Sequence, residues 1–287
     1  MQQAINAGFV QFRRGSDTPR PLADALDLCK AAGFLRLDYL TKGFENADYL
    51  DAAKADREEI ERRGMKVIQS HCPFFRYQEG GIEKFRQFAP RAVEGAAALG
   101  AEFLVIHADE YRSGGKFDAA ETLKKTREYL APVIDLCVKH GVRPAIENLF
   151  EDGFGGGTER SRYTSKAEEV LAVIESFPGS GIGCCLDTGH LHVSAGDEDF
   201  FPELELLAPH VSCTHVHDNK YSIDMHKPAF FGTIDWEKLM AVLKKAGYRG
   251  DLSWEFVYER IPDALYADYL DFMYKCGDYL CGLFEQA

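Results

Sequence analysis

The sequence contains no run of eighteen apolar residues, and its charge balance lacks any basic excess. A membrane-spanning helix needs about 20 predominantly apolar residues, so no such helix is expected. Lysine and arginine total 33 against 46 aspartates and glutamates, which gives a formal net charge of −13. Because contacts to nucleic-acid phosphates need Lys and Arg, this balance argues against a duplex-binding protein. The N-terminal residues MQQAINAGFVQFRRG also lack the apolar core of a signal peptide, and we expect a cytoplasmic protein.

Regular cysteine spacing is also missing. The eight cysteines form no CxxC pair, and Cys184 and Cys185 stand side by side within an apolar stretch. A zinc–thiolate site or a disulfide framework is therefore disfavoured, and reduced, buried thiols are expected. No GxGxxG follows the first apolar stretch, which removes the usual signature of a dinucleotide-binding open sheet.

Short apolar stretches alternate with amphipathic stretches along the whole chain. The apolar stretches predict strands at 5–12, 34–40, 65–71, 102–108, 143–150, 181–189, 211–218 and 251–257. Helices are predicted between them near 19–32, 46–63, 82–99, 117–140, 165–176, 198–208, 235–246 and 262–281. Thr18 before Pro19 and Ser165 before Glu168 have the pattern of helix starts, and Gly33 falls where a helix should stop.

Eight strand–helix units in 287 residues match a (β/α)8 barrel, whose usual size is about 250 residues. The strands are apolar almost throughout, as is typical of parallel strands covered by helices. A doubly wound open sheet is the alternative, although its phosphate-binding loop is missing. No Pro/Ser-rich linker or charge block divides the chain. Residues 1–287 are therefore predicted to form a single α/β domain, a TIM barrel.

Six consecutive predicted strands end in residues that can bind a metal ion. In chain order these residues are His71, His107, Glu147, Asp187 with His190 shortly after it, His217, and Glu255. In a barrel of parallel strands, all these ends meet at the C-terminal mouth, where such enzymes place their chemistry. A lone histidine there is most often a hydrogen-bonded core residue, but six strand ends of this kind indicate a site.

The three carboxylates are the strongest part of this pattern. Acidic residues are rarely buried without a partner, and Glu147, Asp187 and Glu255 would repel each other at one mouth. A divalent cation meets the need for positive charge, with His217 as its fourth ligand. Oxygen-rich ligation with one nitrogen favours Mn²⁺ or Mg²⁺ and leaves Zn²⁺ and Co²⁺ open. His215, one step deeper on the same face, is predicted to be a core residue or to support a ligand.

The motifs IEN, LDTGH, HVHDN and GTIDW, followed by a last strand that bears a Glu, resemble those of the xylose isomerase-like TIM-barrel superfamily. Within it, the sugar phosphate isomerase/epimerase and ketose 3-epimerase families are the most similar. The resemblance implies that one catalytic cation is held by Glu147, Asp187, His217 and Glu255. It also implies that His190 contacts the substrate, and His71 and His107 match histidines of these families that are predicted to do the same.

The same superfamily includes metal-dependent apurinic endonucleases, which hold three metal ions. Asp224 and His226, in SIDMHKP, match their Asp-x-His and are candidates for an additional metal site. A nuclease-like phosphodiesterase is therefore the alternative function. The acidic net charge favours the sugar enzyme, and with it a small-molecule sugar substrate rather than nucleic acid.

The expected reaction is proton transfer next to a carbonyl. The cation would stabilise an enediolate, while Glu147 and Glu255 remove a proton and return it. If the proton returns to the opposite face of the same carbon, the enzyme is an epimerase; if it returns to the adjacent carbon, the enzyme is an isomerase. The substrate is expected to be a sugar, a sugar phosphate or a keto-polyol. Glu151, in the Gly-rich loop after the fifth strand, is a further candidate for binding the substrate. The last helix is apolar around most of its circumference, which leaves a homo-oligomer open.

Overall fold

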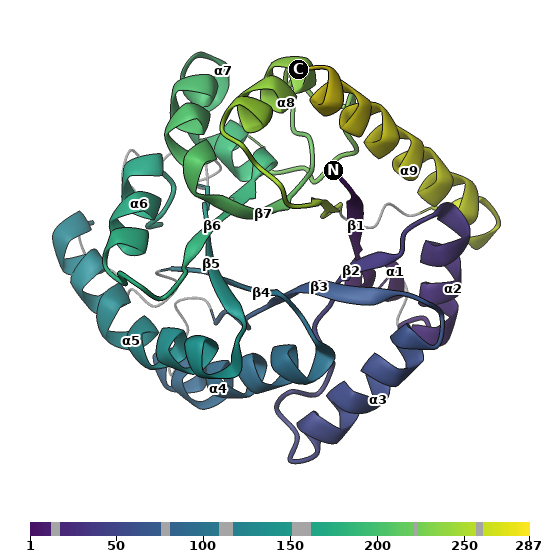
Figure 1. Cartoon of the computed structure of the whole chain (residues 1–287), viewed down its shortest axis with the longest axis horizontal. Helices are drawn as coiled ribbons and strands as arrows, with labels where there is room; N and C mark the ends of the chain where they lie inside the picture. Colours follow the sequence, from purple (N-terminus) through teal and green to yellow (C-terminus); the bar gives the residue numbers. More distant parts are fainter. Residues whose placement is uncertain (13–17, 76–80, 109–116, 151–161, 221–222, 257–260) are drawn as a thin grey trace.

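Eight parallel strands form a ring that helices surround (Figure 1). This computed structural model describes residues 1–12, 18–75, 81–108, 117–150, 162–220, 223–256 and 261–287. The strands are β1 (Gln3–Asn6), β2 (Arg36–Asp38), β3 (Lys66–His71), β4 (Phe103–Ile106), β5 (Arg143–Glu147), β6 (Gly183–Asp187), β7 (Val211–His215) and β8 (Leu252–Trp254). They are hydrogen-bonded in the order β7-β6-β5-β4-β3-β2-β1-β8, and backbone bonds of Val216 to Ser253 and Glu255 join the two ends of the sheet. The predicted TIM barrel is confirmed.

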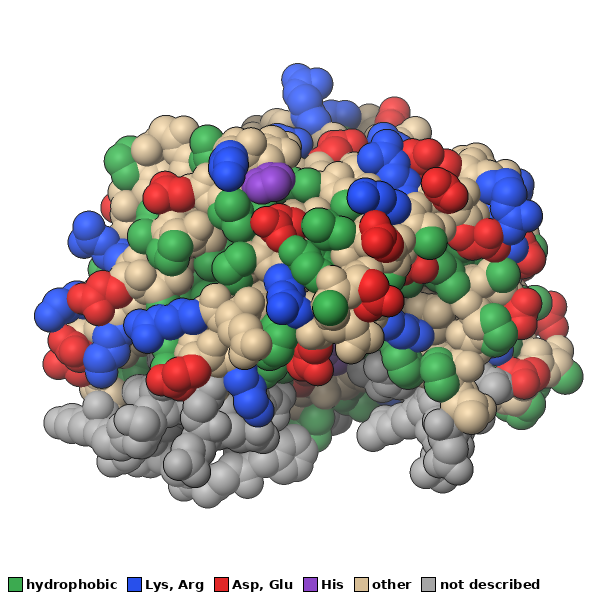
Figure 2. All heavy atoms as spheres, turned by 90° about the horizontal axis from the view of Figure 1, so that it is seen from below, with side chains coloured by type: hydrophobic (Ala, Val, Ile, Leu, Met, Phe, Trp, Pro, Cys, Tyr) green, Lys and Arg blue, Asp and Glu red, His purple; other side chains and the backbone are tan. Residues whose placement is uncertain are grey.

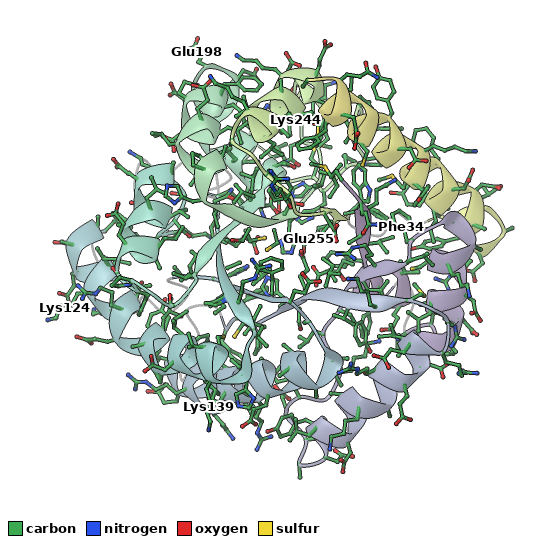
Figure 3. The ribbon with its side chains drawn as sticks, in the orientation of Figure 1. Phe34, Lys124, Lys139, Glu198, Lys244 and Glu255 are labelled. Atoms are coloured by element: carbon green, nitrogen blue, oxygen red, sulfur yellow. The ribbon has the colours of Figure 1, made fainter. Side chains whose placement is uncertain are left out.

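Helices connect the strands on the outside of the ring. They are α1 (Ala7–Gln11), α2 (Leu22–Ala32), α3 (Tyr49–Glu61), α4 (Gly81–Leu99), α5 (Ala119–His140), α6 (Ala167–Glu175), α7 (Thr188–Leu207), η2 (Ala208–His210, a 3-10 turn), α8 (Trp236–Lys245) and α9 (Asp263–Gln286). Gly33 ends α2 in a left-handed conformation, with a φ of 110°, as the sequence predicts. Side chains such as Lys124 and Glu198 point away from the ring, whereas Glu255 lies near its centre (Figure 3).

The first predicted strand is wrong over more than half of its length. The sequence predicts a strand over 5–12, but β1 ends at Asn6 and α1 follows at once. The side chain of Asn6 accepts a hydrogen bond from the backbone N–H of Phe9, at 3.3 Å, and so caps the first helical turn. This short helix carries its apolar residues around the barrel rim instead of along the sheet.

Several predicted helix starts are also displaced. Helix α2 begins at Leu22, with Pro21 instead of Thr18 at its N-cap. Helix α6 begins at Ala167, and the hydroxyl of Ser165 donates to the carbonyl of Arg162 instead of capping the helix. Helix α7 begins at Thr188, directly after β6, and the predicted helix at 198–208 is only its second half. The two halves meet at Gly196, whose φ of 67° interrupts the helical conformation. Because no loop separates β6 from α7, the first turn of α7 lies at the barrel mouth.

The barrel interior contains a separate apolar layer. Phe103, Val105, Ala145, Cys185 and Cys213 form a buried cluster of their own inside the ring. All eight cysteines are free thiols and seven of them are buried, which agrees with the prediction from the sequence. The polar residues described below follow this layer along the strands, toward the C-terminal ends.

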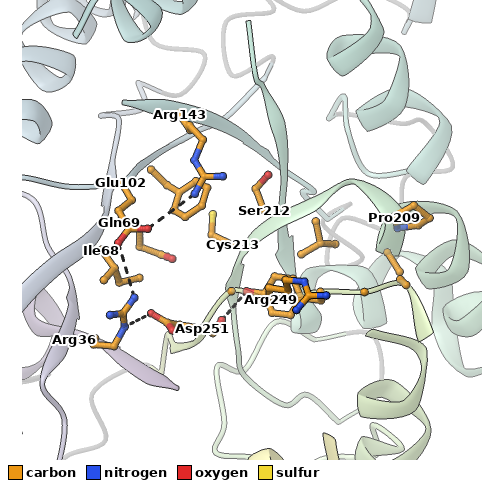
Figure 4. A pocket seen from close by; sticks show the side chains of 17 residues that line it. Arg36, Ile68, Gln69, Glu102, Arg143, Pro209, Ser212, Cys213, Arg249 and Asp251 are labelled. Carbon is orange, nitrogen blue, oxygen red and sulfur yellow. Dashed lines mark hydrogen bonds and ion pairs between the residues drawn. The ribbon is translucent and has the colours of Figure 1, made fainter. Parts of the chain in front are cut away.

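Charged residues close the opposite, N-terminal end of the barrel. Arg36 contacts Asp251 and lies 4.0 Å from a carboxylate oxygen of Glu102, and Arg143 lies 3.9 Å from the other oxygen of Glu102 (Figure 4). These side chains line a cavity of about 310 Å³. Because each of these two arginines has an acidic neighbour and the face is the N-terminal one, we interpret the network as part of the fold's stability.

The molecular surface mixes both signs of charge. Figure 2 shows acidic and basic side chains interspersed over one face of the molecule, without a continuous basic area. None of the described helices is long and apolar enough to cross a membrane. On α9, Leu265, Phe272 and Tyr279 are 55%, 43% and 60% exposed. These side chains are available to a second copy of the chain, and the homo-oligomer stays a prediction.

Candidate active site at the barrel mouth

The C-terminal ends of the strands surround a cavity of about 760 Å³. Of the residues predicted for the site, the cavity is lined by His71, His107, Glu147, His190, Asp224, His226 and Glu255. Asp187 and His217 are fully buried next to these residues and contact each other. Glu151 lies outside the described residues. The structure therefore brings together the candidate residues that it describes.

Three carboxylates converge on one histidine at the base of this cavity, where Asp187 and His215 are fully buried. Ligand atoms of Glu147, Asp187, His215 and Glu255 all lie within 4.8 Å of one another. Glu147 and Asp187 are 1% and 0% exposed. Removing three carboxylates from water at such short range is unfavourable unless a positive charge lies among them. In donor type, the group offers three oxygens and one nitrogen, which suits a divalent cation.

The orientation of His215 supports this interpretation. Its Nε2 lies 3.1 Å from Oδ2 of Asp38, and a ring nitrogen that faces a carboxylate in this way donates its proton. Its Nδ1 lies 3.0 Å from Oε2 of Glu255 and 3.2 Å from Oε2 of Glu147, yet forms no hydrogen bond. Burial would lower the pKa of His215, but Cys185 and the carboxylates of Glu255 and Glu147 hold that pKa well above its usual value. The two carboxylates facing Nδ1 favour positive charge at this position, which a protonated imidazole or a bound cation would supply.

Asp38 is a buried residue of the site that the sequence analysis does not single out. Its Oδ2 accepts hydrogen bonds from the side-chain amides of Gln69, at 3.1 Å, and Asn6, at 3.4 Å, as well as facing His215. The signal that identifies Glu147 was present here also, because Asp38 is an acid at the end of an apolar strand. It is 1% exposed, and its partners fix it against the imidazole.

His217 lies outside the carboxylate group, so the structure offers an alternative to the predicted ligand set, which stays a prediction. Its Nε2 lies 2.9 Å from Oδ1 of Asp187, and His215 takes the place among the carboxylates that the sequence analysis gave to His217. Strand β7 ends at His215, which is paired with Asp187 across the sheet. The pair of Asp187 and His215 is the last one between β6 and β7. The next residue, Val216, pairs with Trp254 of β8, and His217 follows it. Period-two spacing correctly predicts the shared face, but it does not indicate which histidine lies opposite Asp187.

Glu147 is the centre of the histidine arrangement. Its Oε2 lies 3.2 Å from Nε2 of both His71 and His107, and its Oε1 lies 3.1 Å from Nδ1 of His190. Burial would raise the pKa of Glu147, but the neighbouring histidines, His215 and His107 first, hold it well below its usual value. Ligand atoms of His71, Glu147 and His215 form a second group that could hold an ion. Glu147 therefore belongs to two such groups.

A third group lies beside Asp187. It consists of His190, His217, Asp224 and His226, whose ligand atoms lie within 4.8 Å of one another. The His217 and His226 rings are stacked, with centroids 3.9 Å apart, and Nε2 of His226 lies 3.0 Å from Oδ2 of Asp224. Burial would lower the pKa of His226, but Asp224 and Glu255 raise it to about 9. The predicted additional metal site at Asp224 and His226 thus has two more possible ligands, His190 and His217.

Several residues of the sequence motifs have a structural role at this mouth. In LDTGH, Asp187 caps α7 by accepting the backbone N–H of His190 at 2.7 Å. A Cβ on Gly189 would lie 1.9 Å from the His217 ring, so only glycine fits there. In IEN, the side chain of Asn148 bonds the backbone N–H and carbonyl of Asp187, at 2.8 and 2.9 Å. These contacts fix the positions of the strand ends relative to one another.

The remaining two motifs are joined to each other. Asp218 of HVHDN accepts the indole N–H of Trp236 in GTIDW at 3.0 Å, and also the backbone N–H of Phe230. Asn219 donates to the carbonyl of Gly189 and accepts the backbone N–H of Met225. The loop that carries Asp224 and His226 is thereby anchored to β7 and to the first turn of α7.

This TIM barrel has buried carboxylates and histidines at the C-terminal ends of its strands, and its centre is therefore polar and metal-capable. Residues 26–276 match the family described as xylose isomerase-like TIM barrel. The chain therefore belongs to this family, as the sequence motifs predict.

Individual relatives are distant in sequence but similar in fold. An uncharacterized protein of Methanocaldococcus jannaschii is 24% identical over 216 residues, which cover 74% of this chain and 69% of that protein. A xylose isomerase domain protein of Alicyclobacillus acidocaldarius is 18% identical, with a TM-score of 0.75 and 99% of both chains covered. A D-psicose 3-epimerase of Clostridium cellulolyticum has 12% identity, a TM-score of 0.75 and 99% of both chains covered. The 3-keto-D-glucoside 4-epimerase of E. coli has 14% identity and a TM-score of 0.72, with 96% of this chain and all of that chain covered.

Proposed function

We propose that the protein is a metal-dependent sugar isomerase or epimerase. The group of Glu147, Asp187, His215 and Glu255 is the observation that carries this proposal, because its buried negative charges would be balanced by a cation next to a cavity of substrate size. The fold relatives support the reaction class, since they include enzymes that epimerise psicose and a keto-glucoside. The oxygen-rich donor set favours Mn²⁺ or Mg²⁺ over Zn²⁺ or Co²⁺.

The two glutamates are placed for proton transfer. A divalent cation in this group would supply Lewis-acid stabilisation of negative charge on the substrate's carbonyl oxygen. Glu147 and Glu255 approach His215 from β5 and β8, so one is positioned to take a proton from the carbon next to the carbonyl and the other to return one. Burial would raise the pKa of Glu255, but His215 and His226 lower it to about 2, so this base is ionised at neutral pH. His71, His107 and His190 line the same cavity and are proposed to hydrogen-bond substrate hydroxyls.

Deuterium exchange tests the proposed function directly. Protein loaded with Mn²⁺ and incubated in D₂O with a panel of ketoses and keto-sugars is expected to introduce deuterium next to the carbonyl of at least one of them. Chelation with EDTA should abolish the exchange, and added Mn²⁺ should restore it. Absence of exchange from every member of the panel, with metal bound, would contradict the proposal.

Asp38→Asn is expected to weaken Mn²⁺ binding by about 10- to 100-fold, as loss of a partner behind a metal-binding histidine typically does. The asparagine side chain carries no negative charge, and its amide N–H can donate to Nε2 of His215. The imidazole proton can then move to Nδ1, the nitrogen that would bind the cation. Titration calorimetry with Mn²⁺ measures the change.

Asp56→Asn is the matched control for this variant. Asp56 is a partly buried acid that accepts a hydrogen bond from the hydroxyl of Tyr39, away from His215, and its loss should change Mn²⁺ affinity by no more than about twofold. Equal affinity in Asp38→Asn and the parent protein would show that His215 does not depend on Asp38 for its orientation.

A second candidate function is a phosphodiesterase that uses several ions. The observation that favours it is the presence of three neighbouring groups, two of which share Glu147. Two-metal and multi-metal sites of this kind stabilise both oxygens of a phosphoryl displacement. Cleavage of an abasic oligonucleotide by the Mn²⁺- or Zn²⁺-loaded protein, lost in His226→Ala, would establish this function. The net charge of −13 and the mixed surface favour the sugar reaction instead.

A further inference from the structure

The cavity at the barrel mouth has two chemically different halves. Most of the side chains that can hold a cation come from β5 to β8 and the residues after them, and His71 at the end of β3 is the exception. The segments that follow β1, β2 and β3 contribute an apolar wall, made of Phe9, Phe12, Leu40, Phe44, Phe74 and Phe75. None of the six is fully buried, and Phe12 and Phe74 are 43% and 45% exposed. Exposed apolar side chains that gather in one concave site mark a binding surface.

The cavity is also larger than a single sugar needs. A cavity of about 150 Å³ holds benzene, which corresponds to roughly 25 Å³ for each heavy atom. By this measure a hexose, with about twelve heavy atoms, needs roughly 300 Å³. The cavity of about 760 Å³ therefore has space for a second group of similar size.

The two cations in the described lining lie against aromatic rings. Nζ of Lys42 is 3.5 Å from the centroid of the Phe12 ring. The guanidinium of Arg162 is 4.4 Å from the centroid of Phe150 and donates to the carbonyl of that residue. Each cation is thus paired with a ring, Lys42 with Phe12 of the wall and Arg162 with Phe150 on the β5 side of the cavity. The wall therefore suits a planar apolar group better than a phosphate, which needs several free donors.

Resting on the proposed function, we propose that the substrate is a keto-sugar glycoside with a planar, apolar aglycone. The sugar ring lies against the carboxylate and histidine side chains, and the aglycone packs on the apolar wall. The glycosidic bond locks the anomeric carbon, so the reacting carbonyl is a ketone within the sugar ring. Aldose–ketose isomerisation needs a free anomeric carbonyl, and the reaction is therefore an epimerisation.

This reaction balances without a redox partner. The proton on the carbon next to the ring ketone passes to a carboxylate of the site, and the C–H electron pair moves into the enediolate system. Return of a proton to the opposite face of the same carbon restores the ketone with inverted configuration. Proton transfer of this kind needs only the two carboxylates and stabilisation of the oxygen charge.

Matched glycosides test the proposal. Exchange into D₂O is measured by NMR for methyl and 4-nitrophenyl 3-keto-β-D-glucopyranoside with the Mn²⁺-loaded protein. We expect kcat/KM to be about 10- to 100-fold higher for the aryl compound, because its ring is buried against the wall. Phe44→Ala should lower this ratio by about tenfold. Phe231→Ala, which removes a 58% exposed phenylalanine outside the cavity, should leave the ratio unchanged.

A binding measurement separates failure of this proposal from failure of the proposed function. Calorimetry compares methyl β-D-glucopyranoside, 4-nitrophenyl β-D-glucopyranoside and D-glucose 6-phosphate with the same protein. Tighter binding of the aryl glycoside that depends on Phe44, without exchange from either keto-glycoside, supports the aglycone site and counts against the enzyme reaction. Equal binding of the methyl and aryl compounds, or tighter binding of the phosphate, overturns the glycoside proposal.

Discussion

Replacing Glu255 by Gln is expected to lower kcat for proton exchange by about 10²- to 10⁴-fold, the usual contribution of a positioned general acid or base. The amide retains the size of the side chain but cannot accept a proton at neutral pH. The exchange rate is measured at saturating Mn²⁺, so that the loss reports proton transfer rather than an empty metal site. Because the substrate still meets the rest of the cavity, KM should change far less than kcat.

The control for this variant is Glu198→Gln. Glu198 lies on α7 and points away from the barrel (Figure 3), so its substitution should leave both kinetic constants unchanged. A loss of less than about threefold in Glu255→Gln would show that this carboxylate does not transfer the proton. The second carboxylate, Glu147, would then have to act alone, and the reaction would be limited to one face of the substrate.

The second large effect concerns the two histidines of HVHDN. His215→Ala is expected to weaken Mn²⁺ binding by more than 100-fold, because it removes the nitrogen that faces Glu147 and Glu255. His217→Ala should cost about 10- to 100-fold, the range typical of a residue that supports a ligand, since His217 contacts Asp187. Calorimetric titration with Mn²⁺ measures both, and thermal melts show that each variant is folded.

Which of the two variants loses more Mn²⁺ affinity decides between two ligand sets. The sequence pattern alone places His217 at the cation, and a larger loss in His217→Ala would return the site to that arrangement. A larger loss in His215→Ala supports the set of Glu147, Asp187, His215 and Glu255. Asp224→Asn offers a further comparison, because Asp224 belongs to the neighbouring histidine group and not to this one.

The fold could be predicted from the sequence because its signal is repeated eight times. Parallel strands covered by helices are apolar throughout. The alternation of apolar and amphipathic stretches therefore still indicates the barrel when one or two elements are assigned wrongly. The error at β1 shows the limit of the pattern: Asn6 caps a helix within an apolar stretch, and apolar residues alone do not distinguish a strand from a helix over so short a length. The same applies to α7, which begins inside the predicted strand.

Most residues at the barrel mouth could be predicted from the sequence, but their pairing with one another could not. Glu147 and Glu255 could be identified because acids at the ends of apolar strands need partners. The choice between His215 and His217 depends on the register of β6 and β7, which pairs Asp187 with His215 and is set by contacts between strands. Asp38 is also an acid on an apolar strand, but the strand predicted over 34–40 places it inside the strand, whereas β2 ends at Asp38. His226 has a left-handed backbone (φ 46°), which no spacing rule indicates.

The most direct test of the account is the location of manganese in crystals of the protein grown with Mn²⁺. Anomalous scattering at the manganese edge is predicted to place an ion about 2.0–2.3 Å from carboxylate oxygens of Glu147, Asp187 and Glu255 and from Nδ1 of His215. Occupancy of the His190, His217, Asp224 and His226 group as well would support the several-ion phosphodiesterase. An ion bound elsewhere, or no anomalous peak among the three carboxylates, would contradict the central claim.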